Sequence, residues 1–339
     1  MATITNRSEI VFLYDTTNCN PNGDPMDANR PRINEETGKC LVTDVRLKRT
    51  IRDYLFEKGY NGEGSNSLGD IFIRDEKGKV VTGTQRAKSY ANKSEFIQKF
   101  IDVRLFGAVS APKKDTTDKK GKDKKKVEDK VDENSVSSDI DNEGSEEQLD
   151  IQKTFHFTGA VQFGMGKSFN KVKEKFIKGT GAFATKETSI QRTFREEYNI
   201  TYGLIGFHGV INENAAKNTS LSEADVNELI EGMWNGTKNL LTRSKKGHMP
   251  RLLIKVDYSQ KGFFIGDLLE RLSLVYNENI KEDDLENIEQ FRINTNKLIE
   301  VLNKYDSKIS HITVIKDDRI TFTEPIPTKA PITYESISI

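Results

Sequence analysis

Short apolar runs alternate along the chain with a longer stretch whose apolar residues recur every three or four positions. Four runs have the length and the β-branched and aromatic content of strands: 8–14, 154–163, 198–208 and 251–258. Residues 221–242 show helical spacing after Ser222, a favourable capping residue. Their apolar stripe consists of Val226, Leu229, Ile230, Met233, Trp234, Leu240 and Leu241. The pattern predicts an amphipathic helix packed on a sheet.

A second helix is predicted over 44–58. Thr43 is a suitable N-cap, Asp44 lies in the first turn, where the helix dipole favours an acid, and Gly59 follows the end. One face carries Leu47, Ile51, Tyr54 and Leu55, at the spacing expected for packing on a sheet.

In chain order these elements give β-α-β-β-α-β, the ferredoxin-like arrangement that RNA-recognition domains also use. The predicted fold class is therefore α+β. Two long insertions interrupt the order, at 59–153 and 165–197. Connections of this length inside a compact domain are usually functional or disordered.

Weaker patterns predict the remaining elements. They are a small hairpin at 71–83, a helical region over about 266–305 and short strands at 310–315 and 319–323.

Composition adds one clear boundary. The hydrophobic fraction is 35% and the mean hydropathy is −0.64, which is low for a compact globule. Residues 111–150 hold 9 lysines and 13 acidic residues, so the rest of a chain with zero formal net charge is mildly basic. This segment has too few apolar groups to offset its ordering entropy, and we expect a disordered tether. The alternative to a solvated tether is a segment whose lysines contact RNA.

Neither an apolar leader nor a run of transmembrane length is evident, and a cytoplasmic protein is expected. Cys19 and Cys40 form neither a disulfide framework nor a metal-binding spacing. The four histidines make no HxxxH or HExxH pattern, so we expect no metal, no cofactor and no histidine-based catalysis. Asp15, Asp24 and Asp27 remain as carboxylates without a predicted partner.

Cations crowd the loop at 20–32 and the helix after it. Prolines stiffen this loop, which also carries Asn20 and Asn22 and is suited to holding phosphate and sugar. The cations are Arg30, Arg32, Arg46, Lys48, Arg49 and Arg52. The alternative is a solvated helix face with a salt bridge from Arg49 to Asp53.

Three further segments offer phosphate contacts. Residues 164–168 imitate a P-loop, but Val161 stands where the motif needs glycine, which leaves Lys167 and Ser168 as simple contacts. Residues 179–195 interleave Phe183 and Phe194 with the polar and basic residues Thr185, Lys186, Arg192 and Arg195. This pattern suits single-stranded nucleic acid, or a lid whose rings pack down. Arg243 and Lys245 follow the second helix, where they would also complement its C-terminus.

Residues 20–25 (Asn-Pro-Asn-Gly-Asp-Pro), 29–32 (Asn-Arg-Pro-Arg) and 41–49 (Leu-Val-Thr-Asp-Val-Arg-Leu-Lys-Arg) together resemble the crRNA-binding backbone subunit of type I CRISPR Cascade complexes. The type I-B branch is the most similar. The match is dense over 8–58 and looser over 154–258. The resemblance implies a RAMP-superfamily protein with an RRM-like palm and inserted finger and thumb regions.

The resemblance also implies a division of the chain. It places the palm at 1–58, 154–164 and 198–260, the finger-type insertion at 59–153, the thumb-type insertion at 165–197 and a C-terminal helical and β extension at 261–339. It implies that Leu47-Lys48-Arg49 contacts the guide RNA.

We therefore expect a non-catalytic scaffold that binds crRNA, oligomerises along its spacer and presents it to target DNA. Its partners would be crRNA, target DNA through the heteroduplex, further copies of itself and other Cascade subunits. Two rivals stay open: a metal-dependent RNase of the same superfamily using Asp24 or Asp15, and an isolated RNA-binding regulator.

Overall fold

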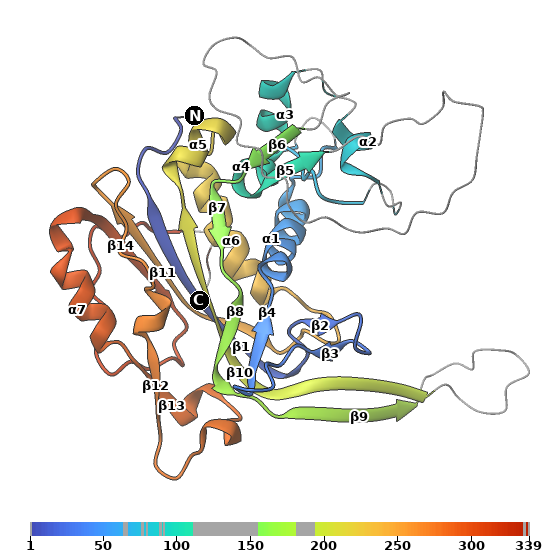
Figure 1. The fold of residues 1–339 in the computed structure, drawn as a ribbon, viewed down its shortest axis with the longest axis vertical. Helices are drawn as coiled ribbons and strands as arrows, with labels where there is room; N and C mark the ends of the chain where they lie inside the picture. The colour runs from blue at the N-terminus through green and yellow to red at the C-terminus, as the bar shows by residue number, and fades with distance from the viewer. Residues whose placement is uncertain are drawn as a thin grey trace, which may run out of the picture.

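A computed structural model describes residues 2–63, 67–75, 78, 81–87, 90, 92–110, 155–180, 194–334 and 337, with the backbone alone at 110, 180, 194 and 195. The predicted tether at 111–150 lies outside the described residues. The described chain is a mixed α/β fold built on a central antiparallel sheet (Figure 1). This agrees with the predicted α+β class.

The central sheet has the strand order β14-β11-β1-β10-β8-β4 among the described residues, with β7 and β9 also paired to β10. These strands are β1 (Ser8–Cys19), β4 (Lys39–Val42), β7 (Val161–Phe163), β8 (Gly166–Lys171), β9 (Glu174–Thr180), β10 (Phe194–Ile211), β11 (His248–Tyr258) and β14 (Ile309–Lys316). Three short pairs stand apart: β2 (Gly23–Asp24) with β3 (Arg30–Pro31), β5 (Gly107–Ser110) with β6 (Phe155–Thr158), and β12 (Ser273–Tyr276) with β13 (Phe291–Asn294).

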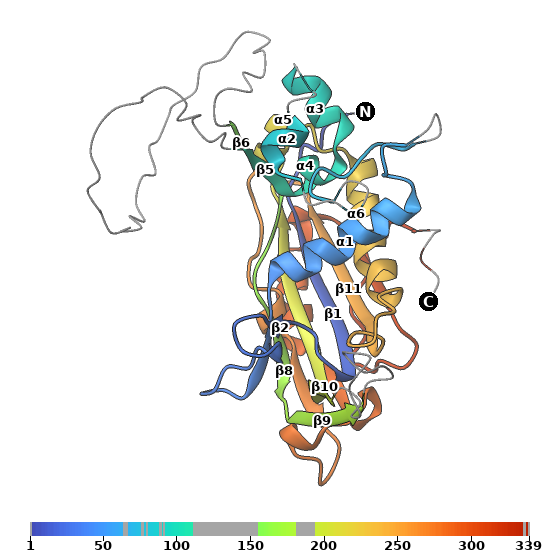
Figure 2. The same ribbon diagram turned by 90° about the vertical axis from the view of Figure 1, so that its right-hand side faces the viewer.

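Successive residues of β1 point to opposite faces of the sheet, and both faces are covered. Ile10 and Phe12 pack with the helices α1 (Asp44–Lys58) and α6 (Glu223–Lys238), which cross the same side of the sheet (Figure 2). Val11 and Leu13 pack on the other side, against the region after β11. The result is a three-layer arrangement of helices, sheet and C-terminal region.

The ends of α1 and α6 follow the predicted local signals. Thr43 caps α1 through its side chain, and Gly59 ends it with a φ of 127°, a conformation that favours glycine. Ser222 and Asp225 form a reciprocal capping box at the start of α6. The helix ends at Lys238, four residues before the predicted boundary.

Other predicted elements need correction. The one strand predicted at 154–163 is two strands in the described residues, β6 and β7, with a bend at Ala160 between them. Beside the bend, Gly159 packs so closely on Phe106 that an added Cβ would lie 2.1 Å from its carbonyl carbon. The hairpin at 71–83 falls partly outside the described residues, and its described part contains no strand. Residues 319–323 form no strand, only an isolated bridge through Phe322 to Ile293.

The sequence predicted a helical region over about 266–305, but the C-terminal region is not mainly helical. It contains one α-helix, α7 (Asn296–Lys304), the pair β12–β13 and four 3₁₀ turns: Leu269–Arg271, Glu282–Asp284, Ile288–Gln290 and Asp306–Lys308. Apolar residues of this region are buried against the sheet. Much of its backbone is irregular, and Asp267 and Asn279 adopt positive φ. The helix α5 (Glu213–Thr219) follows β10 and lies near α4 and β6 (Figure 1).

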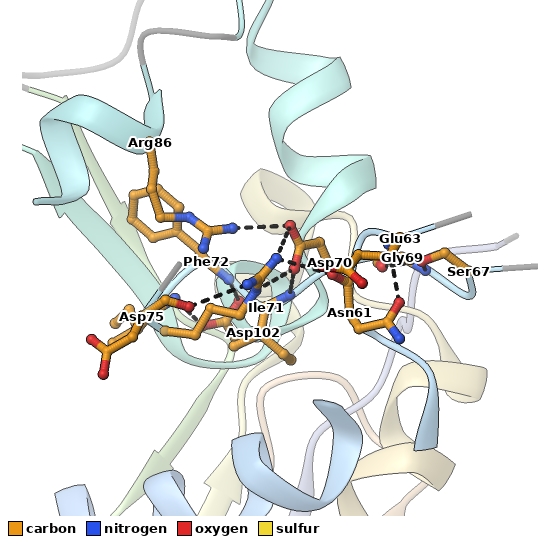
Figure 3. A network of polar contacts seen from close by, with 12 residues as sticks. Asn61, Glu63, Ser67, Gly69, Asp70, Ile71, Phe72, Asp75, Arg86 and Asp102 are labelled. Atoms are coloured by element: carbon orange, nitrogen blue, oxygen red, sulfur yellow. Dashed lines mark hydrogen bonds and ion pairs between the residues drawn. The ribbon is translucent and has the colours of Figure 1, made fainter. Parts of the chain in front are cut away.

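A separate small core holds α2 (Gly83–Ala87), α3 (Lys93–Lys99), α4 (Ile101–Phe106) and the β5–β6 pair. We call this part the α2–α4 module. Its polar centre is Asp70, which pairs with Arg74 at 2.8 Å and with Arg86 at 2.9 Å, next to the buried Asp102 (Figure 3). The network fixes the module on the end of α1.

Both terminal strands of the sheet path have backbone partners on their outer edges, at one residue of β14 and along the short β4. Beyond β14, Ile312 exchanges two backbone hydrogen bonds with Lys329. Beyond β4, Leu41 donates a backbone hydrogen bond to Arg32, and Asn34 donates one to Lys39. The strand β9 extends away from the body together with residues 194–200 of β10 (Figure 1). We call this two-stranded projection the arm.

Candidate nucleic-acid interface

The loop at 20–32 is held in shape by its own asparagines. The Asn20 side-chain amide donates to the Asn29 carbonyl at 2.6 Å. The Asn22 side-chain oxygen accepts from the backbone N and the hydroxyl of Thr43, both at 2.9 Å. Asn22 therefore joins the loop to the first turn of α1, and both asparagines already have protein partners at the positions predicted to contact RNA.

Arg30 fixes this loop to the base of the arm. Its guanidinium forms a two-pronged ion pair with Glu174 of β9, with one nitrogen–oxygen distance of 2.9 Å. It also lies over the Tyr198 ring of β10, 5.2 Å from the ring centre. The Tyr198 ring contacts that of the exposed Phe176 across the arm, with centres 4.9 Å apart. The sequence analysis did not single out these two aromatic residues. They are direct cross-strand partners in the pairing of β9 with β10.

The loop after α6 reaches the same place. Arg243 pairs with Glu197 of β10 at 2.8 Å. Lys245 donates its ammonium to the Asn20 carbonyl, and the Asn20 N–H donates to the Ser244 carbonyl at 3.0 Å. The structure thus brings together three segments, which we call the basic junction: the loops at 20–32 and 242–248, which supply Arg30, Arg243 and Lys245, and the base of the arm, which supplies Glu174 and Glu197.

The cations on α1 fall into two groups. Lys48 pairs with Asp44 at 2.9 Å and Arg49 with Asp53 at 2.7 Å, both within the helix. Arg49 is more than half exposed. An exposed pair such as that of Arg49 contributes about 0–1 kcal/mol, so a phosphate can replace its carboxylate at little cost. The same holds for Arg30, Arg32 with Asp24, and Arg243, all partly exposed. Lys48 is only 14% exposed and also lies over the Phe106 ring.

Arg52 belongs to the second group, because it is buried. Its Nε donates to Asp102 of α4 at 2.8 Å, with side-chain exposures of 9% and 0%, and its guanidinium lies over Phe106. This pair ties α1 to the α2–α4 module. A role of Arg52 in RNA binding stays a prediction, whereas the contact to Asp102 gives it a structural role.

Arg46 lies at the edge of a narrow pocket between α1, β1 and β11. Tyr14, Arg46, Thr50 and His248 contribute to its lining. Burial lowers the pKa of Arg46. Burial and the nearby Arg46 lower the pKa of Lys245 to about 8, and burial together with Lys245 and Arg46 lowers the pKa of His248 to about 3. His248 is thus neutral at pH 7 and is a core residue.

Lys167 and Ser168 lie apart from the basic junction, on β8. Ser168 is buried; its hydroxyl donates to the Asn170 carbonyl at 2.6 Å and accepts from the Cys40 N–H at 2.9 Å. Lys167 is exposed on the opposite side of the strand. Thr185, Lys186 and Arg192 lie outside the described residues, and Arg195 is described by its backbone, which pairs with Gly179.

The carboxylates of the nuclease alternative are engaged elsewhere. Asp24 accepts from the Met26 N–H at 3.0 Å and pairs with Arg32 at 2.9 Å. Asp15 is buried beside Arg251 at 2.9 Å, and burial raises its pKa. Within the part of the chain that the structure describes, no three His, Cys, Asp or Glu residues are grouped so that they could hold a metal ion. Nor does any helix there have the length and apolar character needed to cross a lipid bilayer.

Cations on flexible side chains, one stiffened loop and a projecting arm define a candidate nucleic-acid-binding protein. The family profile described as CRISPR-associated protein Cas7 matches residues 6–296. A CRISPR-associated protein Cas7 from Haloferax volcanii is 31% identical over 336 residues, covering 94% of this chain and 89% of that protein. The chain therefore belongs to the Cas7 family.

Two solved structures have a related backbone course. A chain of a CRISPR RNA-guided surveillance complex has a TM-score of 0.44 and 12% identity, covering 91% of this chain and 87% of its own. A chain of a CRISPR RNA-guided surveillance complex in a pre-nicking state has a TM-score of 0.47 and 10% identity, covering 94% and 96%.

Proposed function

We propose that this Cas7 protein is a non-catalytic scaffold subunit that binds guide RNA (crRNA). It oligomerises along the spacer in a cytoplasmic type I CRISPR interference complex, with other Cascade subunits, and presents the RNA for pairing with target DNA. The observation that carries the proposal is the basic junction, where Arg30 and Arg243 pair with the arm and Lys245 bonds to the loop at 20–32. Asn22 joins that loop to the N-terminus of α1. Family membership supports the proposal.

The strand order supports an RRM-like palm. The strands β1, β7, β10 and β11 form the order β11-β1-β10-β7, with α1 after the first strand and α6 before the last. This is a β-α-β-β-α-β unit with both helices on one face. The α2–α4 module then takes the place of the finger region and the arm that of the thumb.

Binding through the RNA backbone suits a subunit that must accept any spacer. RNA-recognition domains read bases by stacking them on aromatic residues of an open sheet face. Here the C-terminal region covers that face, and Tyr202 and Leu204 of β10 are fully buried beneath it. The cations of the basic junction would instead contact phosphates, which carry no sequence information.

The test uses the full chain freed of nucleic acid and two RNAs of unrelated sequence, each long enough for several subunits. Replacing Lys48 and Arg49 by Ala should weaken binding to both RNAs about equally. The slope of log affinity against log salt should fall by roughly 0.7 for each phosphate that the variant no longer neutralises. Lys297→Ala removes one exposed charge on α7, across the sheet, and serves as the control.

Native mass spectrometry on the same samples counts the subunits on each RNA. A series of masses that increases with RNA length supports the scaffold. Unchanged affinity of the double variant at two salt concentrations would contradict the proposal. RNA cleavage with Mg²⁺ or Mn²⁺ that disappears in Asp24→Ala would establish the nuclease alternative instead.

A further inference from the structure

The pocket beside α1 contains buried polar atoms without protein partners. Arg46 Nε and His248 Nε2 have no hydrogen-bond partner among the described residues, and both residues line the pocket. His248 is 4% exposed. Native proteins satisfy most buried polar atoms, and an unsatisfied one commonly marks a missing water, ion or ligand.

The pocket also has an excess of positive charge. Within the described chain, no carboxylate forms a hydrogen bond or ion pair with Arg46 or Lys245. The acid that acts on Arg46 is Asp53, which is itself bonded to Arg49 at 2.7 Å. Burial and repulsion by the nearby Arg46 lower the pKa of Lys245 to about 8, whereas burial and Arg49 lower the pKa of Arg46. A buried water would satisfy the nitrogen atoms but would leave this charge uncompensated.

We propose that this pocket is an oxyanion site in which Arg46 and His248, which line it, hold one phosphate group, with the neighbouring Lys245 as a second positive charge. The enclosed space accommodates a single water-sized group, so one phosphate oxygen would enter while the remaining oxygens stay at the mouth. Where the phosphate belongs to guide RNA, the inference rests on the proposed function and assigns a fixed backbone phosphate to each subunit. Inorganic phosphate presents the same chemistry.

The first measurement uses the full chain without nucleic acid. Sodium phosphate is compared with sodium chloride at equal ionic strength by thermal unfolding. Phosphate should raise the Tm of the wild type and of Lys297→Gln, an exposed charge on the far side of the sheet. It should give no such rise in Arg46→Gln or in Lys245→Met, which keeps the side-chain length. The Nε2 resonance of His248 should shift with phosphate in the wild type and in Lys297→Gln, but not in Arg46→Gln.

The second measurement identifies the source of the phosphate. If RNA supplies it, Arg46→Gln lowers the salt slope of RNA binding by roughly 0.7, and inorganic phosphate competes with RNA. If Arg46→Gln binds RNA like Lys297→Gln while phosphate still protects the wild type, the site takes the free ion.

Two outcomes separate this inference from the proposed function. No specific phosphate protection, with a salt slope equal to that of Lys297→Gln, overturns the oxyanion site even if the protein binds RNA. Phosphate protection in a protein that does not bind RNA overturns the scaffold function and leaves the oxyanion site standing.

Discussion

The pair between Arg52 and Asp102 allows a sharp test of how α1 holds the α2–α4 module. Asp102 is fully buried and accepts three hydrogen bonds, from the N–H groups of Phe72 at 2.7 Å and Ile73 at 3.1 Å and from Arg52 at 2.8 Å. Arg52→Ala removes the only cation that is bonded to this carboxylate among the described residues. The substitution leaves a buried charge behind.

Breaking a buried ion pair by removing one partner costs about 3–5 kcal/mol. The two remaining N–H donors keep Asp102 partly satisfied, which favours the lower end of that range. Removing the guanidinium from the face of Phe106, whose ring centre is 5.1 Å away, adds about 0.5–1 kcal/mol. We expect Arg52→Ala to destabilise the module by about 3–4 kcal/mol on these grounds.

Arg49→Ala is the matched control, one turn earlier on the same helix. It breaks an exposed pair with Asp53 and should cost about 0.3–0.5 kcal/mol. Because the module has its own core, the destabilisation should appear as local opening. Amide hydrogen exchange over 70–75 and 101–106 measures the free energy of that opening directly.

Opening free energies of Arg52→Ala and Arg49→Ala within about 1 kcal/mol of each other would contradict a structural role of the Arg52–Asp102 pair. The same role is contradicted if Arg52→Ala leaves amide exchange over 70–75 unchanged but weakens RNA binding. That result would support the predicted role of Arg52 as an RNA contact.

Two further predictions concern the sheet. Gly166→Ala should destabilise the protein by about 1–3 kcal/mol in urea unfolding, because the new Cβ would lie 2.4 Å from the buried Phe207 ring, whereas Gly179→Ala, with nothing within 4 Å, should be nearly neutral. Burial alone would raise the pKa of Glu9, but hydrogen bonds from His208, Tyr258 and the Gly266 N–H outweigh it and place the pKa below 4.5. The stabilisation from Glu9 is therefore complete above pH 4.5 and is lost as the pH falls through the lower folded pKa. The free energy of unfolding of Glu9→Gln should fall less steeply than that of the wild type as the pH decreases over that range. Parallel pH profiles of stability for the wild type and Glu9→Gln would disprove the lowered pKa of Glu9.

The helices could be predicted from sequence because their signals are local. Thr43, Gly59 and Ser222 act on backbone groups within a few residues, so the start and end of α1 and the start of α6 were correct. The strands predicted at 8–14, 198–208, 251–258 and 310–315 were placed correctly but were too short, as β10 runs from Phe194 to Ile211. Its extra residues form the arm, where pairing with β9 rather than burial sustains the strand.

The C-terminal region shows where such reasoning fails. Leu268, Leu272, Leu285 and Ile288 have a spacing compatible with a helix, but they pack on the sheet from irregular backbone. The start of this region is held by Glu9, which accepts from the N–H groups at 265 and 266 across more than 250 residues. A contact at that separation leaves no periodic signal in the sequence.

The basic side chains of the interface were identified from sequence, but their partners were not. Arg30 pairs with Glu174 across 144 residues, and Arg52 with Asp102 across 50. Charge counts cannot distinguish an exposed, exchangeable pair from a buried one. The fold makes that distinction, and it separates Arg49 from Arg52 on a single helix.

The covered edges of the central sheet limit how copies of this protein can meet. Residue 329 engages both backbone groups of Ile312 at the outer side of β14, and the segment at 32–34 engages backbone groups of the short β4. These bonds obstruct the addition of a strand from a neighbouring copy at the middle of β14 and at β4. At these two positions, contacts between copies have to use side chains or loops, which are more easily reversed than a continuous β ladder. The same bonds oppose edge-to-edge aggregation of newly made chains at these positions.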